Sequence, residues 1–333
     1  MEYVRLGKTG LMVSPICLGT MALGPPVEKG RSIEIIEEAI ELGINFIDTA
    51  NCYGGYSKNA ETSSGETEEL VGEAIQGKRE EVVLITKVGV PIGYGPQERG
   101  LSATHILREL DASLDRLGTN YIDLYLIHWP DRYTSREETL RAINTAVSQG
   151  KVRYFGISNH SAWQFCEFFH LADKRNWPLP VVSEIPYSML RRDYHDDLQF
   201  YDERDIAVTP YQPLQGGLLT GKYSKKEEPP DDSRAVKKPE WIWDFTDEVF
   251  EEIEELKKLA QEVDVPLSQY ALAWALEQKS VSSVIVGSTK LNHLEEALEA
   301  SEIKIPSDHF EEINRIIPPS ETSTYERLRG EWS

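Results

Sequence analysis

Four side chains that can hold or move a proton stand at or just after the ends of short apolar runs. Asp48 closes the run GINFI, and Tyr53 follows in the turn DTANCYGG. Lys87 and His128 stand near the ends of two later runs, VVLITKV and IDLYLIHW. An ammonium lowers the pKa of a nearby phenol, and a carboxylate holds the ammonium in place. Together the four groups are suited to giving a proton to an oxygen that becomes an alkoxide.

Each of these residues has an ordinary structural explanation when it is taken alone. An aspartate after a strand commonly caps the next helix, and a lysine there commonly extends its charge to solvent. His128, beside Trp129, would commonly be a packing residue. Catalysis is favoured only if the fold brings all of them to one place.

The elements that would do so are eight short apolar runs with longer helical patterns between them. The runs are residues 16–21, 44–50, 82–88, 122–129, 152–158, 181–187, 206–212 and 282–288. Nearly continuous apolar character is typical of parallel strands covered on both faces. The pattern predicts one α/β domain over residues 1–333, a (β/α)8 TIM barrel. A doubly wound open sheet is the alternative, but its GxGxxG nucleotide signature is absent from the sequence.

Other segments fit the same plan. Residues 3–14 predict an N-terminal β-hairpin, and residues 31–43 and 102–118 predict amphipathic helices. The longer segments 54–65, 89–101 and 223–245 each follow a strand. They would therefore form long loops over the C-terminal mouth of the barrel, where the active sites of such barrels lie.

Composition excludes several classes of function. The 56 acidic against 35 basic residues give a formal charge of −21, which repels nucleic acid and anionic membranes. There is no signal-peptide pattern and no apolar run long enough to span a membrane. The three cysteines are scattered, so neither a disulfide framework nor a metal site is expected. We expect a cytoplasmic protein.

Further polar residues at predicted strand ends suggest the partner in the reaction. Ser158 and Asn159 are placed to hold a carboxamide, and Tyr211 is placed to present a flat ring. Those are the needs of a nicotinamide, which supplies a hydride. An enzyme that reduces a carbonyl compound with a nicotinamide cofactor uses every one of these groups.

The sequence also resembles the aldo-keto reductase superfamily from about residue 3 to residue 317. The motifs occur in the expected order: YVRLGKTGLMVSPICLGTM, GINFIDTANCYGG, GETEELVGEAI, RELDASLDRLGTNYIDLYLIHWPD, KVRYFGISN, PYQPLQGGLLTGKY and SVIVGSTKLNHLEEALEA. The resemblance is to the branch that includes potassium-channel β subunits and sugar aldehyde reductases.

The resemblance implies roles for individual residues. The catalytic tetrad would be Asp48, Tyr53, Lys87 and His128, with Tyr53 as the general acid. The nicotinamide would be held by Ser158, Asn159, Glu184 and the ring of Tyr211, and bordered by Thr20, Met21 and Asp48. The pyrophosphate would be lined by Gln212, Pro213, Leu214, Gly217, Leu219 and Lys222. The adenosine end would be wrapped by Gly287, Ser288, Thr289, Lys290, His293 and Glu296.

Two positions depart from the family pattern. Glu184 stands where the family usually has Gln, and an ionised carboxylate accepts but does not donate hydrogen bonds. At the adenosine end, His293 and Ala297 replace an Arg or Gln and an Asn, so one contact to a 2′-phosphate is missing. Lys290 or Arg234 would replace it. We expect NADP as the cofactor, with NAD possible.

The expected partner is a small-molecule carbonyl compound, such as a sugar, and the sequence leaves the oligomeric state open. Two alternatives stand beside the reductase. One is a redox-sensing subunit that binds the cofactor and docks a partner, as potassium-channel β subunits do. The other is a barrel epimerase or lyase that uses bound nicotinamide without net redox change.

Overall fold

Eight parallel strands form the centre of the molecule. The computed structural model describes the chain except for residues 26, 55–64, 225–227, 232, 238–245 and 320–333. The strands are β3 (Ile16–Gly19), β4 (Phe46–Asp48), β5 (Val83–Val88), β6 (Ile122–Ile127), β7 (Val152–Ser158), β8 (Val182–Glu184), β9 (Ala207–Val208) and β10 (Val284–Gly287). Their order is β10-β3-β4-β5-β6-β7-β8-β9, and each predicted run contains one strand. The predicted (β/α)8 barrel is confirmed.

The two outer strands of that order meet through short pairings. The amide of Val208 donates to Ser280 O at 2.7 Å, and the amide of Ile285 donates to Pro210 O at 2.8 Å. A parallel bridge joins Tyr211 to Ile285. The sheet therefore curls back on itself, and the ends of β9 and β10 face one interior.

The predicted N-terminal hairpin is present as the antiparallel pair β1 (Val4–Arg5) and β2 (Met12–Val13). Its Leu6 and Val13 are fully buried in one apolar cluster with Phe46 and Leu124 of the barrel strands. The hairpin therefore plugs the barrel at the end opposite the C-terminal ends of the strands.

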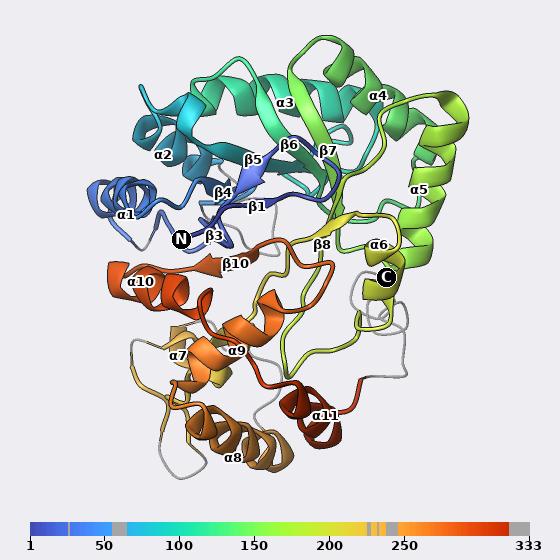
Figure 1. Cartoon of the computed structure of the whole chain (residues 1–333). Coiled ribbons are helices and arrows are strands. Elements are labelled where there is room, and N and C mark those ends of the chain that lie inside the picture. The colour runs from blue at the N-terminus through green and yellow to red at the C-terminus, as the bar shows by residue number, and fades with distance from the viewer. Residues whose placement is uncertain (26, 55–64, 225–227, 232, 238–245, 320–333) are drawn as a thin grey trace.

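Helices cover the outer side of the strands (Figure 1). They are α1 (Lys29–Glu41), α2 (Glu66–Ala74), α3 (Ala103–Leu117), α4 (Arg136–Ser148), α5 (Ala162–Arg175), α6 (Asp197–Asp202), α7 (Arg234–Lys237), α8 (Asp247–Glu262), α9 (Leu267–Leu276), α10 (Leu291–Ala300) and α11 (Ser307–Ile316). The described residues also include the 3₁₀ segments η2 (Arg79–Glu81) and η3 (Gln215–Thr220). Both predicted amphipathic helices are found, as α1 and α3. Ser102 caps α3, and its side chain accepts from the amide of His105.

Side chains alternate between the two faces of each strand, and this decides which groups enter the barrel. On β5, Leu84 packs outward against the helices while Val83 and Ile85 belong to the interior cluster. Lys87 continues the interior set two residues after Ile85. The same alternation places Asp48 two residues after Phe46, so polar groups follow apolar ones toward the C-terminal mouth.

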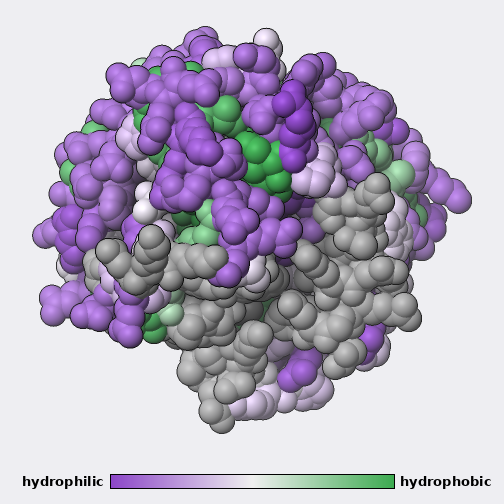
Figure 2. Space-filling model, turned by 90° about the horizontal axis from the view of Figure 1, so that it is seen from below, coloured by the Kyte–Doolittle hydropathy of each residue, from purple (hydrophilic) through white to green (hydrophobic). Residues whose placement is uncertain are grey.

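The surface agrees with the high net charge. On the face shown in Figure 2, the coloured surface is mainly hydrophilic, and hydrophobic residues gather in a small area near its middle. None of the helices in the described part of the chain has the length and apolar character needed to cross a membrane. The predicted loop 89–101 lies within the described residues, whereas most of 54–65 and parts of 223–245 lie outside them.

Candidate active site

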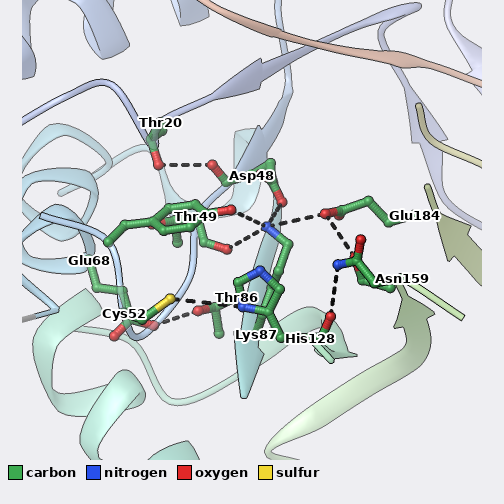
Figure 3. Close-up of polar contacts among 12 residues, drawn as sticks. Thr20, Asp48, Thr49, Cys52, Glu68, Thr86, Lys87, His128, Asn159 and Glu184 are labelled. Atoms are coloured by element: carbon green, nitrogen blue, oxygen red, sulfur yellow. Dashed lines mark hydrogen bonds and ion pairs between the residues drawn. The ribbon is translucent and has the colours of Figure 1, made fainter. Parts of the chain in front are cut away.

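Lys87 is the centre of the polar groups at the C-terminal mouth. Its Nζ lies 2.5 Å from Asp48 Oδ1, 3.0 Å from Thr49 O and 3.2 Å from the Tyr53 hydroxyl. Glu184 Oε1 lies 3.6 Å from the same nitrogen. The lysine side chain is fully buried, so these contacts take the place of water around its charge (Figure 3). The structure thus brings three of the four predicted catalytic residues into direct contact.

The turn after β4 returns the phenol to this centre. The amide of Thr49 donates to Ile85 O at 3.1 Å, and that of Asn51 donates to Lys87 O at 3.4 Å. These bonds extend the pairing of the chain with β5 beyond the end of β4. The amide of Tyr53 then bonds to Ala50 O at 3.1 Å, which closes a tight turn and places the hydroxyl over Lys87.

Gly54 makes this turn possible, and its substitution tests the turn. Its φ is +98°, and a Cβ there would lie 2.7 Å from Glu66 Cβ and 2.9 Å from the amide of Thr67. We expect Gly54→Ala to shift Tyr53 and to lower turnover at least about tenfold, since small misplacements at a reacting centre are costly. Steady-state assays check this.

The matched control is Gly77→Ala. Gly77 also has a positive φ, +80°, but no atom lies within 4 Å of its added Cβ. This variant should lose about 1 kcal/mol of stability from backbone strain and keep its turnover. Equal turnover in both variants would show that the Tyr53 turn tolerates displacement.

His128 lies beside this centre and is neutral. Its ring is 6.0 Å from that of Tyr53, edge to face, and its Nδ1 is 3.8 Å from the thiol of Cys52. Burial, with a smaller contribution from Lys87, lowers the pKa of His128 well below its usual value. A neutral imidazole offers one N–H as a hydrogen-bond donor, and this suits it to orienting a carbonyl oxygen.

The pKa of Tyr53 differs from the sequence-based expectation. Burial raises it well above the usual value, and Lys87 opposes this only in part, while Asp48 and Glu184 raise it further. Lys87 lowers this pKa as expected, but desolvation of the phenolate outweighs that one attraction, so the net shift is upward. Tyr53 therefore keeps its proton until a stronger base is next to it.

Two carboxyl groups share the one ammonium. Burial raises the pKa of Asp48, against the opposing influence of Lys87. Burial and the charge of Asp48 raise the pKa of Glu184 to about 8. Burial works against the charge of Lys87, but the two carboxyl groups outweigh it and hold its pKa well above the usual value.

The opposite wall is formed by the ends of β7 and β8. Asn159 adopts a left-handed backbone with φ of 61°. Its side-chain amide nitrogen, Nδ2, donates to His128 O at 2.9 Å and to Ser158 Oγ at 3.0 Å. The hydroxyl of Tyr211 donates to Asn159 Oδ1 at 2.6 Å. Ser158 Oγ lies 3.4 Å from Glu184 Oε1, and Glu184 Oε2 has no hydrogen-bond partner in the part of the chain described.

Both walls border one cavity of about 300 Å³. Predicted site residues that line it are Met21, Asp48, Tyr53, His128, Asn159, Glu184, Tyr211, Gln212, Pro213, Leu214, Gly217, Lys222, Gly287 and His293. Lining residues that sequence reasoning did not single out are Gly19, Ala22, Trp129, Gly216, Thr220, Ile285 and Val286. Most of the latter are sequence neighbours of predicted positions, which is the signal that would have found them.

Some predicted residues lie elsewhere. Thr20 is fully buried and donates to Asp48 O at 2.8 Å, so it joins β3 to the end of β4. Leu219 is part of the apolar core. Lys290, just before α10, and Glu296, in the middle of α10, are both exposed. The structure places Arg234 at the start of α7, but the side chain lies outside the described residues.

A glycine-rich segment bounds the far side of the cavity. Gly216 and Gly217 have φ of 65° and 99°, and a Cβ on Gly217 would lie 2.7 Å from Lys222 Cε. Only glycine allows both this backbone and this approach of the lysine. Backbone amides with a basic side chain suit a phosphate group. The cavity thus has a site for phosphate at Gly217 and Lys222 and a site for an amide at Asn159. Together these residues fit a nicotinamide dinucleotide.

One buried acid near the site was missed by sequence reasoning. Glu68 on α2 is fully buried; it accepts from Thr86 Oγ1 at 2.5 Å on β5 and from Arg116 Nε at 2.6 Å on α3. It therefore ties the outer face of β5, opposite Lys87, to two helices. Its only sequence signal was its place in the quoted motif GETEELVGEAI.

The chain was also compared with known protein families and proteins. The family model described as Aldo/keto reductase family matches residues 15–318. The chain belongs to the aldo/keto reductase family. It is thus an NAD(P)H-dependent aldo-keto reductase, an enzyme that acts on carbonyl compounds.

Its relatives span most of its length. It is 36% identical over 326 residues to an uncharacterized oxidoreductase, YrpG, of Bacillus subtilis, covering 96% of each chain. It is 34% identical to a probable voltage-gated potassium channel subunit beta of Arabidopsis thaliana, covering 91% of this chain and 92% of that protein. It is 30% identical to the L-glyceraldehyde 3-phosphate reductase of Escherichia coli O157:H7, covering 98% and 95%.

Proposed function

We propose that this aldo-keto reductase reduces an aldehyde or ketone, of the sugar or polyol type, with NADPH and with Tyr53 as the general acid. One observation carries the proposal. One wall of the cavity carries the buried phenol of Tyr53, which contacts Lys87. The facing wall carries Asn159, whose side chain would bind an amide group. A carbonyl between the walls would have a proton donor on its oxygen and the cofactor beside its carbon.

Residues of the protein would transfer the proton to the carbonyl oxygen. The bound cofactor supplies a hydride to the carbonyl carbon. As negative charge develops on the carbonyl oxygen, Tyr53 gives its proton to that oxygen, and the positive charge of Lys87 stabilises the phenolate left behind. Asp48 keeps Lys87 protonated and in place at 2.5 Å. His128 is neutral and donates one hydrogen bond to the same oxygen.

Other residues orient the two reactants. Asn159 Oδ1 accepts from Tyr211 and has a second lone pair, which would accept from the carboxamide nitrogen. The hydrogen bond from the Tyr211 hydroxyl fixes its ring at the cavity wall, where it would stack on the nicotinamide. Met21 and Trp129 line the cavity and pack against the apolar cluster that contains Tyr53, so they would help to exclude water from the carbonyl.

Two observations support NADPH over NADH. His293 lines the cavity, and Lys290 is the residue just before α10. A helix N-terminus with basic side chains suits a phosphate such as the 2′-phosphate. A sugar-type substrate is supported by the polar mouth and by a relative whose name gives L-glyceraldehyde 3-phosphate as its substrate.

Fluorescence titration with NADPH and NADH tests the cofactor, followed by assays with a panel of sugar aldehydes and ketones. We expect NADPH to bind about tenfold or more tightly, as one charge-assisted contact would provide. We expect consumption of NADPH with at least one member of the panel. Equal affinities would refute the cofactor preference, and failure to bind either cofactor would refute the function.

A further inference from the structure

Glu184 lies in a cavity wall where the side-chain donors of Asn159, Ser158 and Tyr211 already donate to other protein groups. Both protons of the Asn159 amide are used, on His128 O and Ser158 Oγ. The Ser158 hydroxyl is directed at Glu184 Oε1, and the Tyr211 hydroxyl at Asn159 Oδ1. A bound carboxamide needs a donor for its oxygen as well as an acceptor for its nitrogen. Among the described residues of this wall, a protonated Glu184 carboxyl would add a donor, for which the carboxamide oxygen and Asp48 would compete as acceptors.

The charges around Glu184 favour that protonated form. Asp48 from β4 is closer to Lys87 of β5, at 2.5 Å against 3.6 Å for Glu184. Two ionised carboxylates on one ammonium would leave a net negative charge in a fully buried group, so the more distant acid takes the proton. Cys17 from β3 and Tyr53 both face this centre, and burial raises their pKa values well above the usual range, so both are neutral.

Glu184 is buried and also lines the cavity, so a bound ligand would affect the charge of its carboxyl group. Its exposed fraction is 3%, and Oε2 lacks a partner within the described chain, although the residue lines the cavity. A ligand that enters the cavity would therefore lie next to this carboxyl group. The ring of an oxidised nicotinamide carries a positive charge, and that of the reduced form is neutral. A carboxylate beside a cation in a site of low dielectric gains more than a neutral hydrogen bond provides.

We propose that Glu184 contacts the cofactor and keeps its proton while the nicotinamide ring is neutral, releasing it when the ring becomes cationic. This inference rests on the proposed function. Glu184 thereby couples the protonation of the site to the redox state of the bound cofactor. A glutamine at this position would hold either form without exchanging a proton.

The coupling supplies the proton that the reduction consumes. Tyr53 gives its proton to the alkoxide oxygen, Lys87 returns one proton to the phenolate, and Glu184 replaces the proton on Lys87. The O–H bond of Glu184 is broken and the O–H bond of the alcohol is formed, with no other proton gained or lost. The negative charge ends on Glu184, where the new positive charge of the ring offsets it.

The test is binding, without substrate. Dissociation constants of NADP⁺ and NADPH are measured by calorimetry from about pH 6 to about pH 9, in buffers of different ionisation enthalpy that report proton release. As pH rises, the dissociation constant of NADP⁺ divided by that of NADPH should fall by up to about tenfold per pH unit, because one proton is released when NADP⁺ binds. The 2′-phosphate titrates in both cofactors, so its contribution cancels in the ratio.

Two variants identify the source of the proton. Glu184→Gln should bind both cofactors with a ratio independent of pH and no extra proton release with NADP⁺. Glu109→Gln is the control, since Glu109 is a buried acid on α3 that bonds to Asn51 and does not line the cavity. It should behave as the unmodified chain does.

The outcomes separate this inference from the proposed function. A pH-independent ratio in the unmodified chain, or a slope that persists in Glu184→Gln, overturns the role of Glu184 while the chain still binds cofactor. Binding of neither cofactor overturns the proposed function instead. If Glu184→Gln does not fold, infrared difference spectra of the unmodified chain decide. Exchange of NADPH for NADP⁺ should remove a protonated-carboxyl band, and an unchanged band contradicts the inference.

Discussion

Replacing Tyr53 with phenylalanine should lower turnover of the carbonyl substrate by about 10² to 10⁴, the cost of losing a positioned general acid. The substitution removes the hydroxyl that lies 3.2 Å from Lys87 and keeps the ring that packs edge to face with His128. Cofactor affinity should change little, because the nicotinamide would be held from the facing wall. Steady-state kinetics and a cofactor titration measure both quantities.

The control for this variant uses a phenol outside the cavity. Tyr125 is fully buried, faces the helices, and its hydroxyl donates to Ile106 O at 3.4 Å. Tyr125→Phe should lose only about 1 kcal/mol of stability and keep its turnover. If Tyr53→Phe kept most of its activity, or lost no more than Tyr125→Phe, Tyr53 would not be the acid.

Replacing Lys87 with methionine should have the largest effect on stability, beside abolishing measurable turnover. The change leaves Asp48 and Glu184 buried without their ammonium, and breaking a buried ion pair costs about 3–5 kcal/mol. Without Lys87, both acids are protonated in the folded chain at pH values where they are ionised in the unfolded chain. Because the unfolded state then binds fewer protons, the free energy of unfolding falls as pH rises.

Urea unfolding at about pH 5.5 and about pH 8.5 measures this loss, which should be larger at the higher pH. Lys151→Met is the control, since Lys151 pairs at 2.5 Å with Asp111 at an exposed site. Exposed pairs contribute about 0–1 kcal/mol, with little dependence on pH in this range. A Lys87→Met variant as stable as Lys151→Met would show that the ammonium does not hold the two acids together.

The barrel was predictable because its signals are local and repeated. Eight apolar runs of strand length alternate with helical patterns, and each run holds one strand of the sheet. The positions of Asp48, Lys87 and Glu184 followed from the same signals, since parallel strands deliver their C-terminal ends to one mouth. The two-residue alternation along each strand then directs these side chains inward.

What the sequence did not predict depends on distances between segments. The net pKa of Tyr53 is decided by burial against Lys87, and burial is a property of the assembled mouth. Likewise, the side-chain amide of Asn159 donates one proton to His128 and the other to Ser158. Only the folded structure shows these two hydrogen bonds. The role of Glu68 behind β5 was missed because its partners lie 18 and 48 residues away in the chain.

The most direct test of the account follows a labelled hydride. NADPH carrying deuterium at the hydride-bearing carbon is incubated with the enzyme and a sugar aldehyde or ketone, and the product is examined by mass spectrometry. The account predicts an alcohol with one deuterium on the former carbonyl carbon, formed together with NADP⁺, and almost none with Tyr53→Phe. A product without deuterium, or a rearranged product formed while NADPH is unchanged, would contradict it and point to an epimerase or lyase.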